Sequence, residues 1–214
     1  MKGNNFIIGM SLLVLLLVSM KLQQETFKPM KDVAGFKTKM TEANKKINTL
    51  KCNFVQEKNL SFMAEKVISK GNMKYKKPDM MRLDYVTPFQ YSMSLYKGKV
   101  MIKDNGKVSK FDTKSNKLFK YINDLMINAV QGNVLDNPDF KFTYKESEKN
   151  FLIEMDPIQA TMKEYVSKVK LTVSRTDYAV TKVEMNESSG DYTIITFTNR
   201  VYNTVLADEE FVVK

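Results

Sequence analysis

Apolar and polar residues alternate one by one through much of this chain, and the pattern is clear in residues 71–88, GNMKYKKPDMMRLDYVTP. Successive side chains of a β-strand point to opposite faces of a sheet, so a period of two predicts strands with one apolar face. The stretch indicates two strands on either side of a Lys-Lys-Pro corner. Five apolar residues in it carry odd numbers and should therefore share one face, namely Met73, Tyr75, Met81, Leu83 and Tyr85.

The same alternation predicts a succession of strands along most of the chain. Lys-Gly, Asn-Gly and Ser-Gly pairs at 97–98, 105–106 and 189–190 separate neighbouring runs and favour tight hairpin turns. Short connections of this kind imply an antiparallel meander of about ten strands with one wet face. We predict strands at 49–56, 67–75, 81–85, 89–95, 100–103, 108–112, 140–144, 151–155, 169–173, 183–185 and 192–198.

Two segments have a helical period instead. Between Val33 and Leu50 the apolar residues recur every three or four positions, which predicts one amphipathic helix. A second apolar stripe runs from Leu118 to Val130 and ends before Gly132, a natural helix stop. Because many twisted strands curl, we expect an α+β, mainly β fold. Its curled antiparallel sheet should form an incomplete barrel, with the two helices covering an apolar concave side.

The N-terminus is predicted to be a secretory signal peptide. Lys2 precedes an apolar run from Phe6 to Val18, which is too short to span a bilayer comfortably. We assign the signal to residues 1–24, with its cut site left open, and a single domain to residues 25–214. An uncleaved membrane anchor is the alternative.

Cys52 is the only cysteine and lies far beyond this apolar run. It cannot be the acylated first residue of a mature lipoprotein, and a single cysteine forbids an internal disulfide. An exported domain of this kind must depend on its hydrophobic core. The strand-like surroundings of Cys52 favour a buried, inert thiol over a nucleophile.

The chain contains no histidine, which excludes Ser-His-Asp and Cys-His catalysis and imidazole metal sites. No nucleotide-binding or metal-binding motif is present, so we predict no metal and no cofactor. A Ser-Lys pair involving Ser92 or Ser94 is the remaining catalytic alternative, but neither serine lies in a recognisable nucleophile turn. We therefore expect a binding protein and not an enzyme.

The formal net charge of +10 favours contact with anionic surfaces. Of the 34 basic residues, however, only Arg82, Arg175 and Arg200 are arginines. A nucleic-acid reader would be expected to use more guanidinium groups, which bind guanine and phosphate through two hydrogen bonds. We predict no nucleic-acid partner and assign most lysines to the solvated surface.

The apolar face of the sheet can be an ordinary core or a ligand site, and alternation alone is typical of a core. Fifteen methionines and no tryptophan favour a ligand site, since methionine is unbranched and polarizable and recurs where variable apolar partners bind. The candidate lining residues of such a ligand site are Met73, Tyr75, Met81, Leu83, Tyr85, Phe89, Tyr91, Met93 and Leu95.

A motif in this region resembles the LolA/LolB-type periplasmic lipoprotein carriers. It consists of Phe54-x-Gln56 followed by Gly71-x-Met-x-Tyr-Lys-Lys77-Pro78-x-x-Met81-Arg82-Leu83-x-Tyr85-x-x-Pro88. The match is dense over residues 47–104 and looser beyond. The resemblance implies a half-barrel lidded by helices, in a monomer that is soluble in the periplasm after signal cleavage. It also implies that the candidate ligand site is a lipid-binding cavity, which the acyl chains of cargo lipoproteins enter. Such lipoproteins would be received from an inner-membrane lipoprotein-releasing ABC transporter and carried to an outer-membrane acceptor of unknown identity.

The resemblance further implies that a basic residue before the first proline, often arginine, hydrogen-bonds to the lid helices and holds the empty carrier closed. Lys77 occupies this position. Lysine lacks the planar fork of arginine, so we expect lid control by Lys77 to be weaker or to use other partners. The nearby Arg82 falls at an even position, and we predict a surface charge.

A carrier or sensor of another lipid or hydrophobic ligand on the same fold is the alternative function. The sequence leaves open which lipoproteins or lipids are carried. It also leaves open whether the last segment, 207–214, pairs as a strand or docks on a partner.

Overall fold

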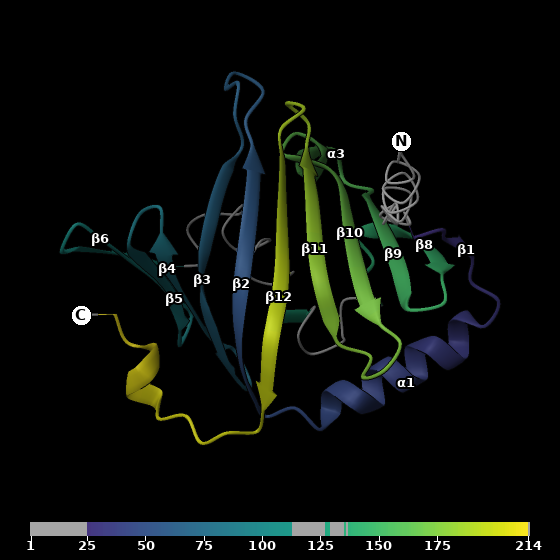
Figure 1. Cartoon of the computed structure of the whole chain (residues 1–214), viewed down its shortest axis with the longest axis horizontal. Helices are drawn as coiled ribbons and strands as arrows, with labels where there is room; N and C mark the ends of the chain where they lie inside the picture. The colour runs from purple at the N-terminus through teal and green to yellow at the C-terminus, as the bar shows by residue number, and fades with distance from the viewer. Residues whose placement is uncertain (1–24, 113–126, 129–134, 136, 214) are drawn as a thin grey trace, which may run out of the picture.

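The computed structural model describes residues 25–112, 127–128, 135 and 137–213. Its central feature is a 12-stranded antiparallel sheet with the order β1-β8-β9-β10-β11-β12-β2-β3-β4-β5-β6-β7 (Figure 1). The strands are β1 (Lys28–Pro29), β2 (Thr49–Asn59), β3 (Val67–Lys76), β4 (Met80–Thr87), β5 (Tyr91–Tyr96), β6 (Lys99–Asp104), β7 (Lys107–Asp112), β8 (Phe140–Glu146), β9 (Asn150–Pro157), β10 (Val166–Ser174), β11 (Val180–Glu187) and β12 (Tyr192–Tyr202).

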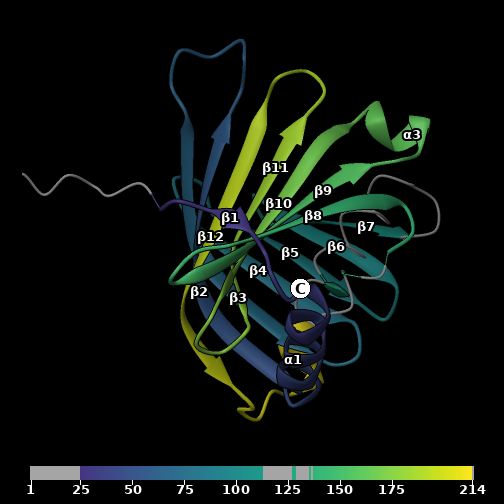
Figure 2. The same cartoon turned by 90° about the vertical axis from the view of Figure 1, so that its right-hand side faces the viewer.

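The sheet curls strongly but does not close, because its edge strands β1 and β7 are not paired with each other (Figure 2). The prediction of a mainly β fold with a curled antiparallel sheet is confirmed. The hairpin turns at Lys97-Gly98 and Asn105-Gly106 are also confirmed, with positive φ at both residues of each pair, as type I′ turns require. The two-residue strand β1 was not predicted.

Strand β5 begins at Tyr91, so the predicted strand start at Phe89 is wrong. Pro88 has no N–H group to donate to a neighbouring strand, and the chain turns before β5 begins. This turn separates Phe89 from the alternating residues that follow it.

Besides helical residues at 127–128 and 135, the described part of the chain contains the helices α1 (Val33–Lys45) and α3 (Ala160–Lys163) and the 3₁₀ helix η2 (Asp208–Phe211). Helix α1 begins where the Oδ1 atom of Asp32 accepts a hydrogen bond from the Gly35 amide at 2.8 Å. It lies at one end of the strands, opposite the β2–β3 hairpin tip (Figure 1). The described strands and helices include no helix long and apolar enough to cross a membrane.

Helix α1 ends at Lys45, so the prediction of one helix reaching Leu50 is wrong. Near its end, the Asn44 side chain donates to the carbonyl of Met40 at 2.7 Å, and the chain then enters β2 at Thr49. The helix predicted from Leu118 to Val130 lies outside the described residues, apart from a helical pair at 127–128.

The inner face of the sheet carries two separate groups of buried side chains. The first core lies where α1 packs on β8–β11, and the second core lies on β2–β6. The first core contains Phe36, Met40, Leu135, Phe140, Phe151, Ile153, Met155, Met162, Val169, Leu171 and Val173. The second core contains Leu50, Cys52, Phe54, Met73, Tyr75, Met81, Leu83, Tyr85, Leu95, Val100 and Ile127.

The chain after β12 packs on the opposite, outer face of β3–β5, on the side of the sheet away from β8–β11 (Figure 1). Phe211 and Leu206 are buried there against Met80, with Tyr96 beside them. We call residues 203–213 the C-terminal segment. It docks on this chain's own sheet and does not add a strand, which answers a question that the sequence left open.

Even-numbered side chains of β3–β5 hold the C-terminal segment in place. Lys76 Nζ donates to the Leu206 carbonyl at 2.8 Å, and Arg82 Nη1 donates to the carbonyls of Glu210 and Val212 at 3.1 and 3.2 Å. Arg82 also pairs with Asp84. The prediction that Arg82 is a simple surface charge is therefore wrong, because its backbone partners come from a distant part of the chain.

Candidate functional site

The register of β3, β4 and β5 brings the odd-numbered residues together on the inner face. Met73 pairs with Leu83, Tyr75 with Met81 and Tyr85 with Tyr91 across neighbouring strands. Eight of the nine predicted lining residues contribute to the second core, namely Met73, Tyr75, Met81, Leu83, Tyr85, Tyr91, Met93 and Leu95. Of these eight, Tyr91 and Met93 are partly exposed and the others are buried. Their proposed contact with a lipid stays a prediction. Phe89 does not join them, because its side chain is 73% exposed.

Two contacts between residues of the sequence motif fix this arrangement. The Tyr85 hydroxyl donates to the Gln56 side chain at 2.8 Å, which ties β4 to β2. At Gly71, an added Cβ atom would lie 2.2 Å from the carbonyl oxygen of Asp84 and 2.6 Å from the Phe54 ring. Glycine is therefore needed where β3 passes between the Phe54 ring and β4.

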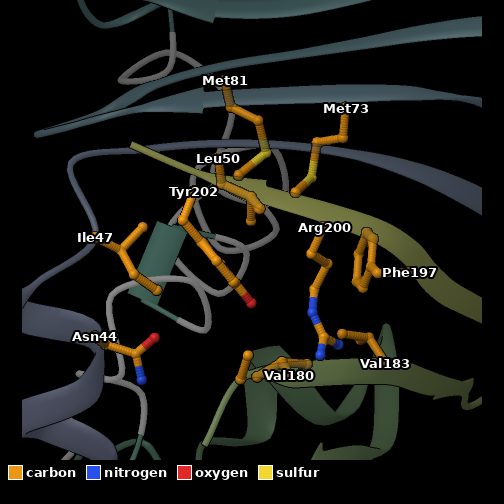
Figure 3. Close-up of a pocket in the computed structure, with 11 residues that line it drawn as sticks. Asn44, Ile47, Leu50, Met73, Met81, Val180, Val183, Phe197, Arg200 and Tyr202 are labelled. Atoms are coloured by element: carbon orange, nitrogen blue, oxygen red, sulfur yellow. The ribbon is translucent and has the colours of Figure 1, made fainter. Parts of the chain in front are cut away.

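A cavity lies between the first and second cores (Figure 3). Its volume of about 40 Å³ exceeds what one water molecule needs and is far smaller than a long hydrocarbon chain. Of the predicted lining residues, only Met73 and Met81 border it. The full lining is Asn44, Ile47, Leu50, Met73, Met81, Ala179, Val180, Val183, Phe197, Arg200 and Tyr202.

A bulge in β12 brings Arg200 and Tyr202 to this cavity. The pairing with β2 shifts register between Thr198 and Val201, and Asn199 has a φ of 53°. Side chains alternate along a strand, so one extra residue exchanges the faces of all residues after it. Arg200 and Tyr202 therefore border the same cavity as Phe197, although their numbers differ in parity.

Asp177, in the turn between β10 and β11, holds both of these side chains. Its Oδ2 atom accepts a hydrogen bond from Arg200 Nη2 at 2.8 Å and one from the Tyr202 hydroxyl at 3.2 Å. Burial alone would raise the pKa of the Asp177 carboxyl. The Arg200 charge, the Ala179 amide and the neighbouring hydroxyl groups outweigh it and bring this pKa below its ordinary value. Asp177 is thus an ionised anchor for Arg200.

Lys77 contacts the end of α1 from the β3–β4 turn. Its Nζ atom donates to the carbonyl oxygens of Lys45 at 2.8 Å and Asn44 at 3.3 Å, and its amide donates to Asn48. The last carbonyls of a helix lack partners within the helix and carry partial negative charge, which a cation satisfies. Lysine therefore reaches the helix without the planar fork of arginine. A role of this contact in lid control stays a prediction.

Cys52 is buried, as predicted, and burial raises the pKa of its thiol to about 12. The two serines of the Ser-Lys alternative lie on the outer face and have structural partners. Ser94 donates to the carbonyl of Phe211, and Ser92 donates to Asp84. In the ranges that the structure describes, no cluster of three or more acidic, cysteine or histidine residues could hold a metal ion.

Sequence reasoning missed the side of the cavity that β11 and β12 provide. Arg200 and Tyr202 were not predicted to reach the inner face, because the predicted strand ended at residue 198 and an unbroken alternation through Phe197 would put even-numbered residues on the outer face. A signal was present in the sequence. Asn199 is a residue type that tolerates positive φ and so marks a place where a strand can bulge, although Val201 continues the odd-numbered apolar spacing of Ile195 and Phe197.

The fold and the cavity define a class of protein built on an open, curved sheet with an apolar cavity on its inner face. The chain belongs to the LolA family, since the family model for the outer membrane lipoprotein carrier protein LolA matches residues 45–214. This match confirms the resemblance noted in the sequence. Among curated proteins, none matches this chain.

Several solved structures are similar to this chain at low sequence identity. A LolA superfamily protein of Nitrosomonas europaea has a TM-score of 0.43 and 9% identity, covering 84% of this chain and 96% of that chain. The Mycobacterium tuberculosis lipoprotein LppX has a TM-score of 0.45 and 7% identity, covering 81% and 96%. A chain of the Pseudomonas aeruginosa MucA/MucB complex has a TM-score of 0.48 and 13% identity, covering 84% and 60%. The family assignment rests on the family model and not on these structures.

Proposed function

We propose that this protein is a periplasmic chaperone that binds the acyl chains of lipoproteins and carries them from the inner to the outer membrane. The observation that carries the proposal is an apolar cavity between the two cores, in a chain of the LolA family. The cargo chains enter this cavity and spread over the inner face of β3–β5. Residues 1–24 direct export, and the remaining residues work as a monomer without catalysis or cofactor.

Helix α1 acts as a lid in this mechanism. The cavity is too small for an acyl chain, so the chain must enter as the two cores separate and α1 moves away from β2–β4. Separation exposes apolar side chains to water, and each methylene of the cargo that covers them contributes about 0.8 kcal/mol. Cargo binding and lid opening therefore stabilise each other, and release follows when another site buries the acyl chains better.

Lys77 controls the lid because it joins the β3–β4 turn to the last carbonyls of α1. Breaking two such hydrogen bonds is a modest cost that bound cargo can offset. An inner-membrane lipoprotein-releasing ABC transporter supplies the cargo, and an outer-membrane acceptor receives it.

The experiment that tests this function is purification of the tagged full-length protein from periplasm, followed by mass spectrometry of everything bound to it. We expect triacylated lipoproteins in the bound fraction, and we expect purified protein to release such lipoproteins from spheroplasts. Recovery of a different lipid alone, without release of lipoproteins, would support the alternative carrier or sensor and contradict the proposal.

A further inference from the structure

Arg200 is the one permanently charged side chain among the cavity-lining residues that the structure describes. Figure 3 shows it extending from β12 toward Val180 and Val183 on β11, with Phe197 beside it. A charged group in apolar surroundings costs free energy unless it is paired and hydrogen-bonded. An ordinary apolar residue would pack this position more simply, so the arginine calls for a functional explanation.

The guanidinium of Arg200 is fixed in place but only partly used. Of its five N–H groups, one donates to Asp177, which also accepts from Tyr202, and the guanidinium interacts with the Tyr202 hydroxyl as well. The buried polar side-chain atoms without a partner, among the described residues, do not include any nitrogen of Arg200. The remaining donors of Arg200 are therefore open to the cavity, or to solvent at its mouth.

The charge around Arg200 selects the kind of acceptor that fits these donors. Asp177 neutralises the guanidinium, and its own carboxylate would repel a second anion such as a phosphate or a free carboxylate. A neutral carbonyl oxygen meets the same N–H groups without that repulsion. Apolar side chains lie on both sides of Arg200, so a carbonyl at this point would have hydrocarbon contacts on either side.

We propose that Arg200 donates hydrogen bonds to the ester carbonyl oxygens of the bound acyl groups. The cavity then distinguishes ester-linked acyl chains from ether-linked alkyl chains of the same length. This inference rests on the proposed function and adds a specificity-determining residue to it. The bulge at Asn199 serves this role, because without it the side chain at position 200 would point to the outer face.

The test compares two synthetic lipopeptides that differ only in their linkage. One carries two palmitoyl esters on an S-glyceryl cysteine, and the other carries two hexadecyl ethers at the same positions. A fluorescent label on the peptide reports binding by anisotropy. A hydrogen bond from a charged donor contributes about 1.5–3 kcal/mol net. We therefore expect the wild-type protein to bind the diester at least about tenfold more tightly than the diether.

Arg200→Gln should bind both lipopeptides with equal affinity, close to that of wild type for the diether. The double variant Asp177→Asn, Arg200→Gln removes both charges together, leaves no unpaired carboxylate, and should also bind both equally. Arg175→Gln is the matched control, because Arg175 pairs with Glu146 and does not border the cavity; this variant should keep the ester preference. Comparing two probes within each variant cancels any general loss of stability.

Two results would overturn the inference while leaving the carrier function intact: equal binding of both lipopeptides by the wild type, or an ester preference that survives in both Arg200 variants. Failure of the wild type to bind either lipopeptide would contradict the proposed function itself.

Discussion

The ammonium group of Lys77 lies 2.8 Å from the carbonyl oxygen of Lys45, the last residue of α1. Lys77 belongs to the turn between β3 and β4, and both of these strands border the second core, whereas α1 packs on the first core. This hydrogen bond therefore joins the two sides of the cavity.

We predict that Lys77→Leu impairs delivery of cargo more than it impairs folding. Losing these hydrogen bonds should lower the free energy of unfolding by about 1 kcal/mol, measured by urea denaturation. Release of lipoprotein from spheroplasts should persist, while transfer to outer-membrane vesicles should fall severalfold. Lys77→Arg, which keeps the donor and the charge, is the control. Normal transfer by the leucine variant would remove Lys77 from the site.

A charge placed in the cavity should block cargo binding. Val183→Glu would put a carboxylate beside Phe197 and Arg200, where the proposed function places an acyl chain. We expect loss of lipoprotein release with a circular dichroism spectrum like that of wild type. Val201→Glu is the matched control on the neighbouring strand, because Val201 is 50% exposed and does not border the cavity. Equal release by both variants would contradict the cavity assignment.

The C-terminal segment should contribute strongly to stability. Phe211 is fully buried on the outer face, so Phe211→Ala should lower the free energy of unfolding by about 3–5 kcal/mol. Val205→Ala, in the same segment but 96% exposed, should change it little. Urea denaturation measures both variants. A small effect of Phe211→Ala would mean that the segment leaves the sheet easily.

The Asp177 carboxyl should make stability depend on pH at the acidic end. Its pKa is lower in the folded protein than its ordinary value of 3.8, since Arg200, Ala179 and hydroxyl neighbours outweigh the effect of burial. Its stabilising contribution is therefore fully present above pH 4 and is lost as the pH falls through the folded-state pKa. Denaturation between pH 2.5 and 7 should show a smaller pH dependence for Asp177→Asn than for wild type.

Cys52 should react slowly with thiol reagents as long as the second core stays closed. Burial raises the pKa of Cys52 to about 12, so almost no thiolate exists near neutral pH in the folded protein. We expect slow reaction with a thiol reagent at pH 8 and fast reaction in denaturant. Because Cys52 belongs to the second core, a modification rate that rises with added lipopeptide would report opening of that core. Fast modification of the folded protein without lipopeptide would contradict the burial of Cys52.

The parts of the structure that follow from local alternation were predictable from the sequence. Tyr75 and Met81 were assigned to one face from their spacing alone, and the sheet register pairs them. The curl followed from the number of strands. The end of α1 was not predictable, because Ile47 and Leu50 continue its apolar spacing although they belong to the cavity and to β2.

The remaining differences come from contacts between residues far apart in the chain. Arg82 was predicted as a surface charge because nothing near it in sequence indicates that carbonyls of the C-terminal segment lie above it. Arg200 was missed because a single bulge changes the face of every later residue in β12. Period-two reasoning assumes an unbroken register, so it fails where one residue is inserted.

The central pairing of β12 with β2 also determines when the protein can fold. Phe54 of β2 lies opposite Phe197 of β12, so strands far apart in the sequence must pair before hydrogen bonds join the two cores. Pairings so distant in sequence form slowly, because the entropy of closing the intervening loop must be overcome first. A nascent chain that still lacks β12 therefore cannot join β11 to β2, and the two halves of the sheet stay separate until β12 is made.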